Sequence, residues 1–180
     1  VNRPKHIMII GGGVFQVPAI KTAKSMGLKV MVTDYNPESE GMLLADFPIE
    51  VSTRNINLTV NTAKQFHIAC PLDGVMTVGT DASQTVAAVA DALNLPGIPF
   101  EVAERATDKI KMRQILQEKG VPVPQFRPVW TLDEGREAIS SMELPLVIKP
   151  CDNMGARGVR KIERPDDLIP AFREAKEASI

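Results

Sequence analysis

The feature that most constrains the fold is a short apolar run that ends at a row of glycines. The run His6–Ile10 (HIMII) is followed directly by Gly11-Gly12-Gly13, and apolar residues then recur at helical spacing in Val17, Ile20 and Ala23. An apolar run without polar alternation is typical of a central parallel strand, because helices cover both faces of such a sheet. The start of the chain therefore predicts a strand–loop–helix unit of an α/β protein.

The same alternation of strand and helix continues through the first hundred residues. The further predicted strands lie at 28–34, 47–51 and 73–78, and the further predicted helices at 39–45, at 57–66 and around an apolar stripe of Val86, Val89, Ala90 and Leu93. Short connections between alternating strands and helices predict a parallel sheet with right-handed crossovers. We therefore expect residues 1–100 to form one doubly wound, Rossmann-like domain.

The pattern changes after Pro99, where a helix is followed by stiff chain and then by a hairpin. The first predicted element is a helix capped by Thr107-Asp108 that runs to Lys119 and is closed by Gly120. It is followed by an extended segment at 121–124, a strand at 125–129, a helix opened by Thr131 with Glu134 in a capping box, strands at 146–149 and 158–163, and a last helix that starts at Pro165. We therefore expect residues 101–180 to form a second part with α+β organisation.

Composition excludes several functional classes. The 180 residues carry 21 Lys and Arg against 22 Asp and Glu, and this balance argues against a protein that binds nucleic acid. No apolar run approaches the ~18 residues that span a bilayer, and the run near the start is too short for a signal peptide. Cys70, Cys151 and the two histidines lack metal-ligand spacing, which indicates reduced thiols, no metal site and a cytoplasmic protein.

Three interpretations of Gly11-Gly12-Gly13 remain open on sequence alone. Glycines between a strand and a helix let the backbone approach a ligand, and the helix N-terminus attracts anions, so the loop can bind a substrate. Asp34 closes the next strand, where a dinucleotide fold has its ribose-binding acid, so an NAD(P)-binding module of an oxidoreductase is the second interpretation. Gln16 stands where the third glycine of GxGxxG belongs, which weakens that interpretation. The third is a purely structural turn in a non-catalytic domain.

A second candidate ligand position is Gly79-Thr80-Asp81, directly after the predicted strand 73–78. Open α/β sheets bind ligands at the carboxyl ends of their strands, so Thr80 and Asp81 are candidate substrate contacts. Both residue types are also good N-caps for the helix that follows. The sequence leaves both roles open.

The strongest candidate is a predicted hairpin that carries two glycines and several cations. It reads Lys149-Pro150-Cys151-Asp152-Asn153-Met154-Gly155-Ala156-Arg157-Gly158. Such a loop can fold over a triphosphate, with backbone N–H groups and Arg157 directed at its oxygens and Lys149 acting as a point charge at the loop base. The P-loop pattern GxxxxGK(S/T) is absent. The alternative is an ordinary glycine-bearing hairpin with surface cations.

Taken in order, these segments resemble the ATP-grasp ligase superfamily. IMIIGGG and VTDYNP are similar to the domain that precedes the ATP-grasp fold in biotin carboxylase, carbamoyl phosphate synthetase and the purine-pathway ligases. ATDKIKMRQILQEKGVPVPQF resembles the beginning of the ATP-grasp domain, and LPLVIKPCDNMGARGV resembles its lysine strand and flexible glycine loop. The resemblance thus covers nearly the whole chain, with a pre-ATP-grasp domain at 1–100 and the first part of an ATP-grasp domain at 101–180.

The resemblance implies roles for the matched positions. Lys109 corresponds to a helix cation on the ATP phosphates, Lys149 to the strand lysine on the α- and β-phosphates, and the loop that closes over the phosphates comprises Asn153, Met154, Gly155, Ala156, Arg157 and Gly158. The loop Gly11-Gly12-Gly13 corresponds to one that faces the acceptor substrate. The implied reaction activates a carboxylate as an acyl phosphate at the expense of ATP, and an amine or related nucleophile then displaces phosphate.

The resemblance also implies what these 180 residues do not contain. In the family, the Mg²⁺ ligands and the adenine hinge come from a later half of the ATP-grasp domain, so we expect an N-terminal fragment of a ligase that does not turn over by itself. ATP and Mg²⁺ are the implied cofactors, and small-molecule carboxylate and amine substrates are the implied partners. We expect no nucleic acid and no membrane partner, and the sequence leaves a homodimer open.

Overall fold

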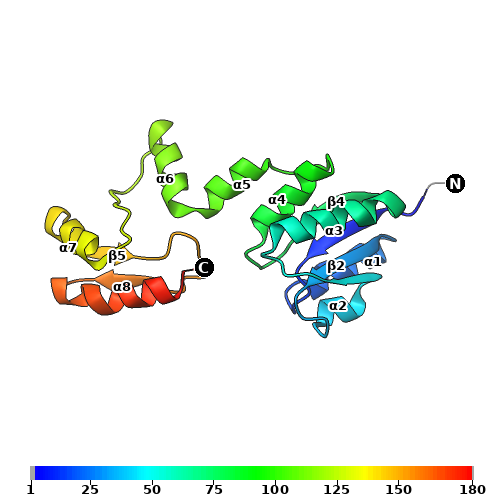
Figure 1. The fold of residues 1–180 in the computed structure, drawn as a ribbon, viewed down its shortest axis with the longest axis horizontal. Helices are drawn as coiled ribbons and strands as arrows, with labels where there is room; N and C mark the ends of the chain where they lie inside the picture. The colour runs from blue at the N-terminus through cyan, green and yellow to red at the C-terminus, as the bar shows by residue number, and fades with distance from the viewer. Residues whose placement is uncertain (1–2, 180) are drawn as a thin grey trace. The chain divides into compact units, whose positions relative to one another are not determined.

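The computed structural model describes residues 3–179 (Figure 1). The chain divides into two compact units, Val1–Glu104 and Arg105–Ile180. The division lies inside the helix α5 (Phe100–Thr107), close to the predicted boundary at residue 100.

Unit 1 is a parallel four-stranded sheet with helices between its strands. The strands are β1 (His6–Ile10), β2 (Lys29–Asp34), β3 (Phe47–Glu50) and β4 (Leu72–Met76), in the order β3-β2-β1-β4, and the helices are α1 (Val17–Ser25), α2 (Glu40–Leu44), α3 (Ile56–Ala69) and α4 (Ser83–Ala92). This order and direction confirm the predicted doubly wound α/β fold.

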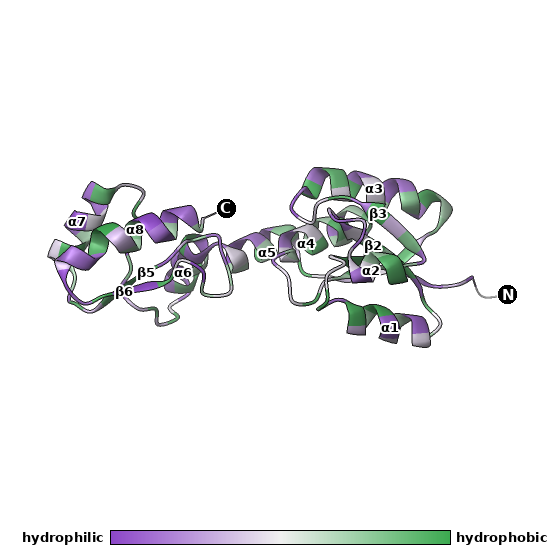
Figure 2. Cartoon of the chain, turned by 90° about the horizontal axis from the view of Figure 1, so that it is seen from below, coloured by the Kyte–Doolittle hydropathy of each residue, from purple (hydrophilic) through white to green (hydrophobic). Residues whose placement is uncertain are grey.

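Helices cover both faces of this sheet, as the apolar runs predict. Ile9, Val30 and Val32 pack on one face with Ile20 of α1 and Met42 of α2. The other face packs against α3 and α4, so α1 and α3 lie on opposite sides of the strands (Figure 2). Burying one such Ile or Val side chain contributes about 1.5–3 kcal/mol, and this two-sided core fixes the carboxyl ends of β1, β2 and β4 at one edge.

Unit 2 combines helices with a two-stranded antiparallel hairpin. Its elements after α5 are α6 (Lys109–Glu118), α7 (Leu132–Ser141), β5 (Leu146–Ile148), β6 (Arg160–Ile162), the 3-10 turn η1 (Pro165–Asp167) and α8 (Leu168–Glu177). Ile162, Leu168 and Ala171 form the core of this unit, with Leu132 and Ile139 of α7 packed against them. The capping box predicted for Thr131 and Glu134 is present.

Two predictions for the middle of the chain are wrong. Residues 125–129 form no strand. Pro124 and Pro128 remove backbone N–H donors there, so the segment cannot join a ladder. The cap predicted at Thr107-Asp108 is also partly wrong, because Thr107 is the last residue of the unpredicted helix α5 and Asp108 alone caps α6. Among the described residues, no helix is long and apolar enough to cross a membrane.

Candidate functional site

Three cations of unit 2 lie near one another at the start of α6 and the end of β5. The side chain of Asp108 accepts hydrogen bonds from the backbone N–H groups of Ile110 (2.8 Å) and Lys111 (3.0 Å), which fixes the first turn of α6. Lys109 is the first residue of that helix, and Arg113 follows one turn later on the same face. Lys149 directly follows β5.

The ammonium of Lys149 lies in the field of the two other cations. Partial desolvation of its ammonium lowers the pKa of Lys149 below its ordinary value, and the like charges of Arg113 and Lys109 lower it further. The residue as a whole is exposed, so water screens much of this repulsion. A cluster of like charges that repel one another is suited to an anion with several charges.

The segment before α7 holds Arg113 in this cluster. The Arg113 guanidinium donates to the carbonyl of Pro124 (3.4 Å) and lies over the ring of Phe126, 5.5 Å from its centroid. The 121–126 segment therefore orients a cation although it forms no strand. We did not identify Arg113 as a site residue from sequence, since its position depends on this packing.

The predicted phosphate loop is an irregular connection between β5 and β6. Residues 151–158 form bends and turns and no helix. Gly155 and Gly158 have positive φ angles (71° and 69°), and Ala156 has a φ of 58°. A Cβ on Gly158 would lie 2.6 Å from the Cβ of Ala178 and 3.1 Å from the Cα of Ala175, so only glycine fits where the loop meets α8.

Asn153 fixes this loop from inside. Its side chain is 8% exposed, and its amide nitrogen donates to the backbone carbonyl of Ala178. Its side-chain oxygen accepts from the Met154 N–H (2.8 Å) and from the Nε (3.1 Å) and Nη2 (2.8 Å) of Arg157. Arg157 is therefore held against the loop, while Met154 is 48% exposed.

Lys109 binds the same loop. Its backbone N–H donates to the carbonyl of Cys151 (3.0 Å), and its ammonium donates to the carbonyls of Asn153 and of Cys151, the latter at 3.4 Å. Burial raises the pKa of the Cys151 thiol, and the carboxylates of Asp152 and Asp108 raise it further. The thiol is therefore protonated at neutral pH and is a poor nucleophile.

The glycine loop of unit 1 lies at the carboxyl edge of the sheet. Gly11 donates its N–H to the carbonyl of Thr33 (2.7 Å), and Gly12 donates its N–H to Oδ2 of Asp34 (2.7 Å). The other carboxylate oxygen of Asp34 accepts from the N–H of Asn36 (2.9 Å). Asp34 is 8% exposed, so its carboxylate supports the loop from within the protein.

Gln16 closes this loop toward β4. Its side chain is 3% exposed and donates to the carbonyl of Val78. Its amide atoms lie 3.1–3.2 Å from the position that a Cβ on Gly11 would take, so the side chain fills space that a third glycine would leave open. The sequence identified Gln16 as a departure from GxGxxG, but its bond to Val78 depends on the tertiary fold.

The structure places Thr80 beside the glycine loop and corrects one of its predicted roles. A Cβ on Gly11 would lie 3.4 Å from Cγ2 of Thr80, so the two loops are in contact. The helix α4 begins at Ser83 with Ala82 at the N-cap, and this cap makes no side-chain hydrogen bond. Thr80 and Asp81 therefore do not occupy the N-cap, because the chain continues two residues further before it becomes helical.

The described residues contain no group of three His, Cys, Asp or Glu side chains that could hold a metal ion.

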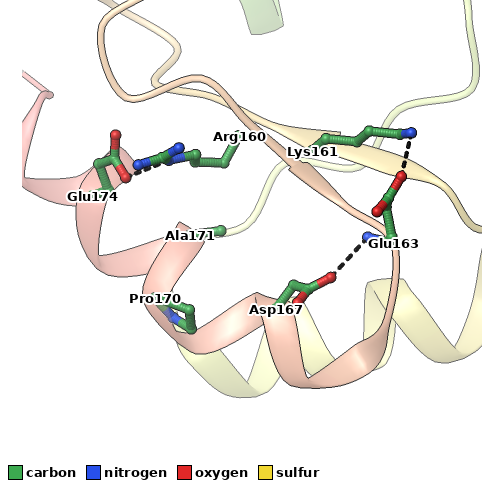
Figure 3. A pocket seen from close by; sticks show the side chains of 7 residues that line it. All are labelled: Arg160, Lys161, Glu163, Asp167, Pro170, Ala171 and Glu174. Atoms are coloured by element: carbon green, nitrogen blue, oxygen red, sulfur yellow. Dashed lines mark hydrogen bonds and ion pairs between the residues drawn. The ribbon is translucent and has the colours of Figure 1, made fainter.

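A shallow groove between β6 and α8 is lined by Arg160, Lys161, Glu163, Asp167, Pro170, Ala171 and Glu174 (Figure 3). Its charged side chains form ion pairs with one another, Arg160 with Glu174 (2.5 Å) and Lys161 with Glu163 (2.5 Å). It contains none of the predicted ATP-binding residues, and we assign it no role in the site.

Residues 1–109 match the family described as alanine dehydrogenase/PNT, C-terminal domain. The uncharacterized protein y4rH of Sinorhizobium fredii is 32% identical over 110 residues, which cover 61% of this chain and 23% of that protein. The chain therefore spans less than a quarter of this relative.

Two solved structures extend the similarity over both units. The L-amino acid ligase from Bacillus licheniformis is 28% identical, with a TM-score of 0.73 over 98% of this chain and 43% of the ligase. The ADP complex of N5-carboxyaminoimidazole ribonucleotide synthetase is 22% identical, with a TM-score of 0.76 over 99% of this chain and 46% of the synthetase. The matched length is less than half of each of these proteins.

Proposed function

We propose that this chain, whose residues 1–109 place it in the family described as alanine dehydrogenase/PNT, C-terminal domain, is the phosphate-binding part of an ATP-dependent ligase. The premise is its fold, which over both units is that of the N-terminal part of ATP-grasp ligases. The solved structures that match over both units confirm the predicted resemblance to ATP-grasp ligases. The nucleotide, the reaction and the substrates below are our proposal.

The observation that carries the proposal is the cation cluster beside the glycine-bearing loop. The ammonium of Lys109 donates to two carbonyls of the loop 151–158, and the charges of Lys109 and Arg113 repel the partly desolvated ammonium of Lys149. Phosphoryl transfer depends mainly on positioning and on neutralising the charge of the phosphates. In this proposal Lys109 and Lys149 bind phosphate oxygens, and Arg113 adds a third positive charge.

The proposed reaction has two steps. A substrate carboxylate oxygen attacks the γ-phosphorus of ATP, and the bond from that phosphorus to the β-phosphate oxygen breaks, which gives an acyl phosphate and ADP. The amine of a second small-molecule substrate then attacks the acyl carbon, phosphate leaves and the amine loses a proton. The carboxyl edge of the unit 1 sheet, with Gly13, Thr80 and Asp81, is the proposed substrate side.

The described residues do not fit Mg²⁺, because they provide no three-ligand acidic group. We therefore derive no step through the metal from this chain. In the proposal, the Mg²⁺ that accompanies ATP is held outside these residues.

The family description of residues 1–109 supports a second candidate, a dinucleotide-binding module of a dehydrogenase. The geometry of the loop opposes it. The Asp34 carboxylate already accepts the Gly12 N–H, and Gln16 fills the place of the third glycine. The Gly12 N–H is therefore not available to a pyrophosphate, so we prefer the ligase.

Calorimetric titration of the chain with MgATP and with NADH tests the two candidates directly. We expect binding of ATP and none of NADH. Lys149→Met should weaken ATP binding about tenfold, since one charge-assisted contact is worth roughly 1.5–3 kcal/mol. Lys119→Met, at the exposed end of α6, is the matched control and should bind ATP as the unaltered chain does. Tight NADH binding without any response to ATP would overturn the proposal.

A further inference from the structure

We propose that Lys109 and Asn153 together hold the loop 151–158 in position, so that Lys109 binds the loop backbone as well as phosphate. The phosphate part of this inference rests on the proposed function, but the loop part does not. Lys109 contributes from the start of α6, and Asn153 contributes from within the loop. Together they join α6, the loop and α8.

Lys109 holds the loop from the side of α6. An ammonium group has three donors, and Lys109 directs it at two loop carbonyls, those of Asn153 and Cys151. The Cys151 carbonyl also accepts the backbone N–H of Lys109, so the first turn of α6 is docked onto the loop by both main chain and side chain. One donor of the ammonium remains for a phosphate oxygen.

Both of these acceptors are uncharged carbonyls. A carboxylate partner would neutralise the ammonium and oppose an incoming phosphate, whereas a carbonyl orients the ammonium and leaves its charge in place. Lys109 can therefore fix the loop and attract an anion at the same time. This combination distinguishes Lys109 from Lys149, whose ammonium is partly desolvated and repelled by Arg113 and Lys109.

Asn153 holds the loop from within and connects it to the residues after α8. Its backbone carbonyl accepts from Lys109, its side-chain nitrogen donates to the Ala178 carbonyl beyond α8, and its side-chain oxygen accepts from Arg157. The side chain is 8% exposed, so losing these bonds would leave buried polar groups without partners. The position of Lys109 is thereby linked to Arg157 at the loop tip.

Amide exchange of the chain, followed by NMR, tests the loop part. The reporter is the backbone N–H of Met154, which donates a hydrogen bond to the side-chain oxygen of Asn153. Lys109→Met should accelerate its exchange about tenfold, the factor expected when one hydrogen bond to a charged group is lost. Lys109→Arg should restore protection, because a guanidinium also donates to carbonyls. Lys149→Met removes a neighbouring charge without touching the loop and should change the exchange less than twofold.

Titration with inorganic tripolyphosphate tests the phosphate part. Asn153→Ala retains all three cations of the cluster, so a purely electrostatic site would bind tripolyphosphate unchanged. We expect about fivefold weaker binding, because the loop loses its position.

Two results would overturn the inference. One is unchanged Met154 exchange in Lys109→Met, and the other is equal acceleration in Lys149→Met, which would indicate a general charge effect. Unchanged tripolyphosphate binding in Asn153→Ala, with faster loop exchange, would overturn the link to phosphate. If the unaltered chain does not bind tripolyphosphate, the proposed function fails, while the exchange experiment still decides whether Lys109 positions the loop.

Discussion

The two glycine-bearing loops of this chain differ in the charge of the group that supports them. In unit 1, a buried carboxylate, Asp34, accepts the Gly12 N–H. In unit 2, a neutral amide, Asn153, supports the loop, and Lys109 binds the loop backbone. Glycines permit close approach of a ligand in both places, but in the first loop the supporting group itself is negatively charged. We therefore propose that the supporting group, rather than the glycines alone, makes the second loop the better place for a phosphate.

The two glycines of the loop 151–158 differ in how closely they are packed, and replacing the packed one, Gly158, has the largest expected effect on stability. Gly158→Ala should destabilise unit 2 by about 3 kcal/mol, because it adds left-handed strain of roughly 1–2 kcal/mol to a clash with Ala178. Gly155→Ala adds the strain alone, since nothing lies within 4 Å of its Cβ position, and should cost about 1 kcal/mol. Urea unfolding followed by the fluorescence of Trp130, the single tryptophan, measures both.

Equal losses of stability in these two variants would contradict the packing of Gly158 against α8. The loop would then be free of that helix, and the contrast between a supported loop and an open hairpin would disappear.

The next largest effect concerns the carboxylate of unit 1. Asp34→Ala should destabilise the chain by about 2 kcal/mol, because the N–H groups of Gly12 and Asn36 lose their acceptor in a buried place. Glu38→Ala, an exposed acidic neighbour, is the matched control and should change stability by less than about 0.5 kcal/mol. Thermal unfolding followed by circular dichroism measures both.

Asp34→Ala also sharpens the comparison of the two loops. It should leave tripolyphosphate binding unchanged, because the proposed phosphate site lies in unit 2. Weaker tripolyphosphate binding in this variant would indicate that the anion binds at the glycine loop of unit 1. The proposed difference in phosphate binding between the two loops would then be wrong.

The sequence was informative wherever an apolar run and a turn signal coincide. HIMII before three glycines and LVI before Lys149 predicted two strands and the loops that follow them, since burial on both faces and glycine turns are local signals. Asp108 and Thr131 likewise predicted two helix starts, because a cap bonds within its own first turn.

The contacts that distinguish the two loops could not be predicted in this way. Asn153 bonds to Ala178, 25 residues further along the chain, and Gln16 bonds to Val78, 62 residues away. Arg113 lies over the ring of Phe126, in a segment predicted to be a strand. These pairings depend on how the helices dock, and residue type and spacing do not encode that docking in a local pattern.

The smallest expected effect is a change in the titration of Lys149. Partial desolvation and the charges of Arg113 and Lys109 hold the pKa of Lys149 below its ordinary value of 10.5, so its ammonium loses its proton earlier as the pH rises. Tripolyphosphate binding, which needs the charged form, should therefore weaken as the pH rises through this lowered pKa. Lys109→Met removes one like charge and should raise the pKa of Lys149, whereas Lys119→Met should not. NMR titration of the Lys149 side chain measures the shift, and no difference between the variants would mean that the two ammonium groups are not neighbours.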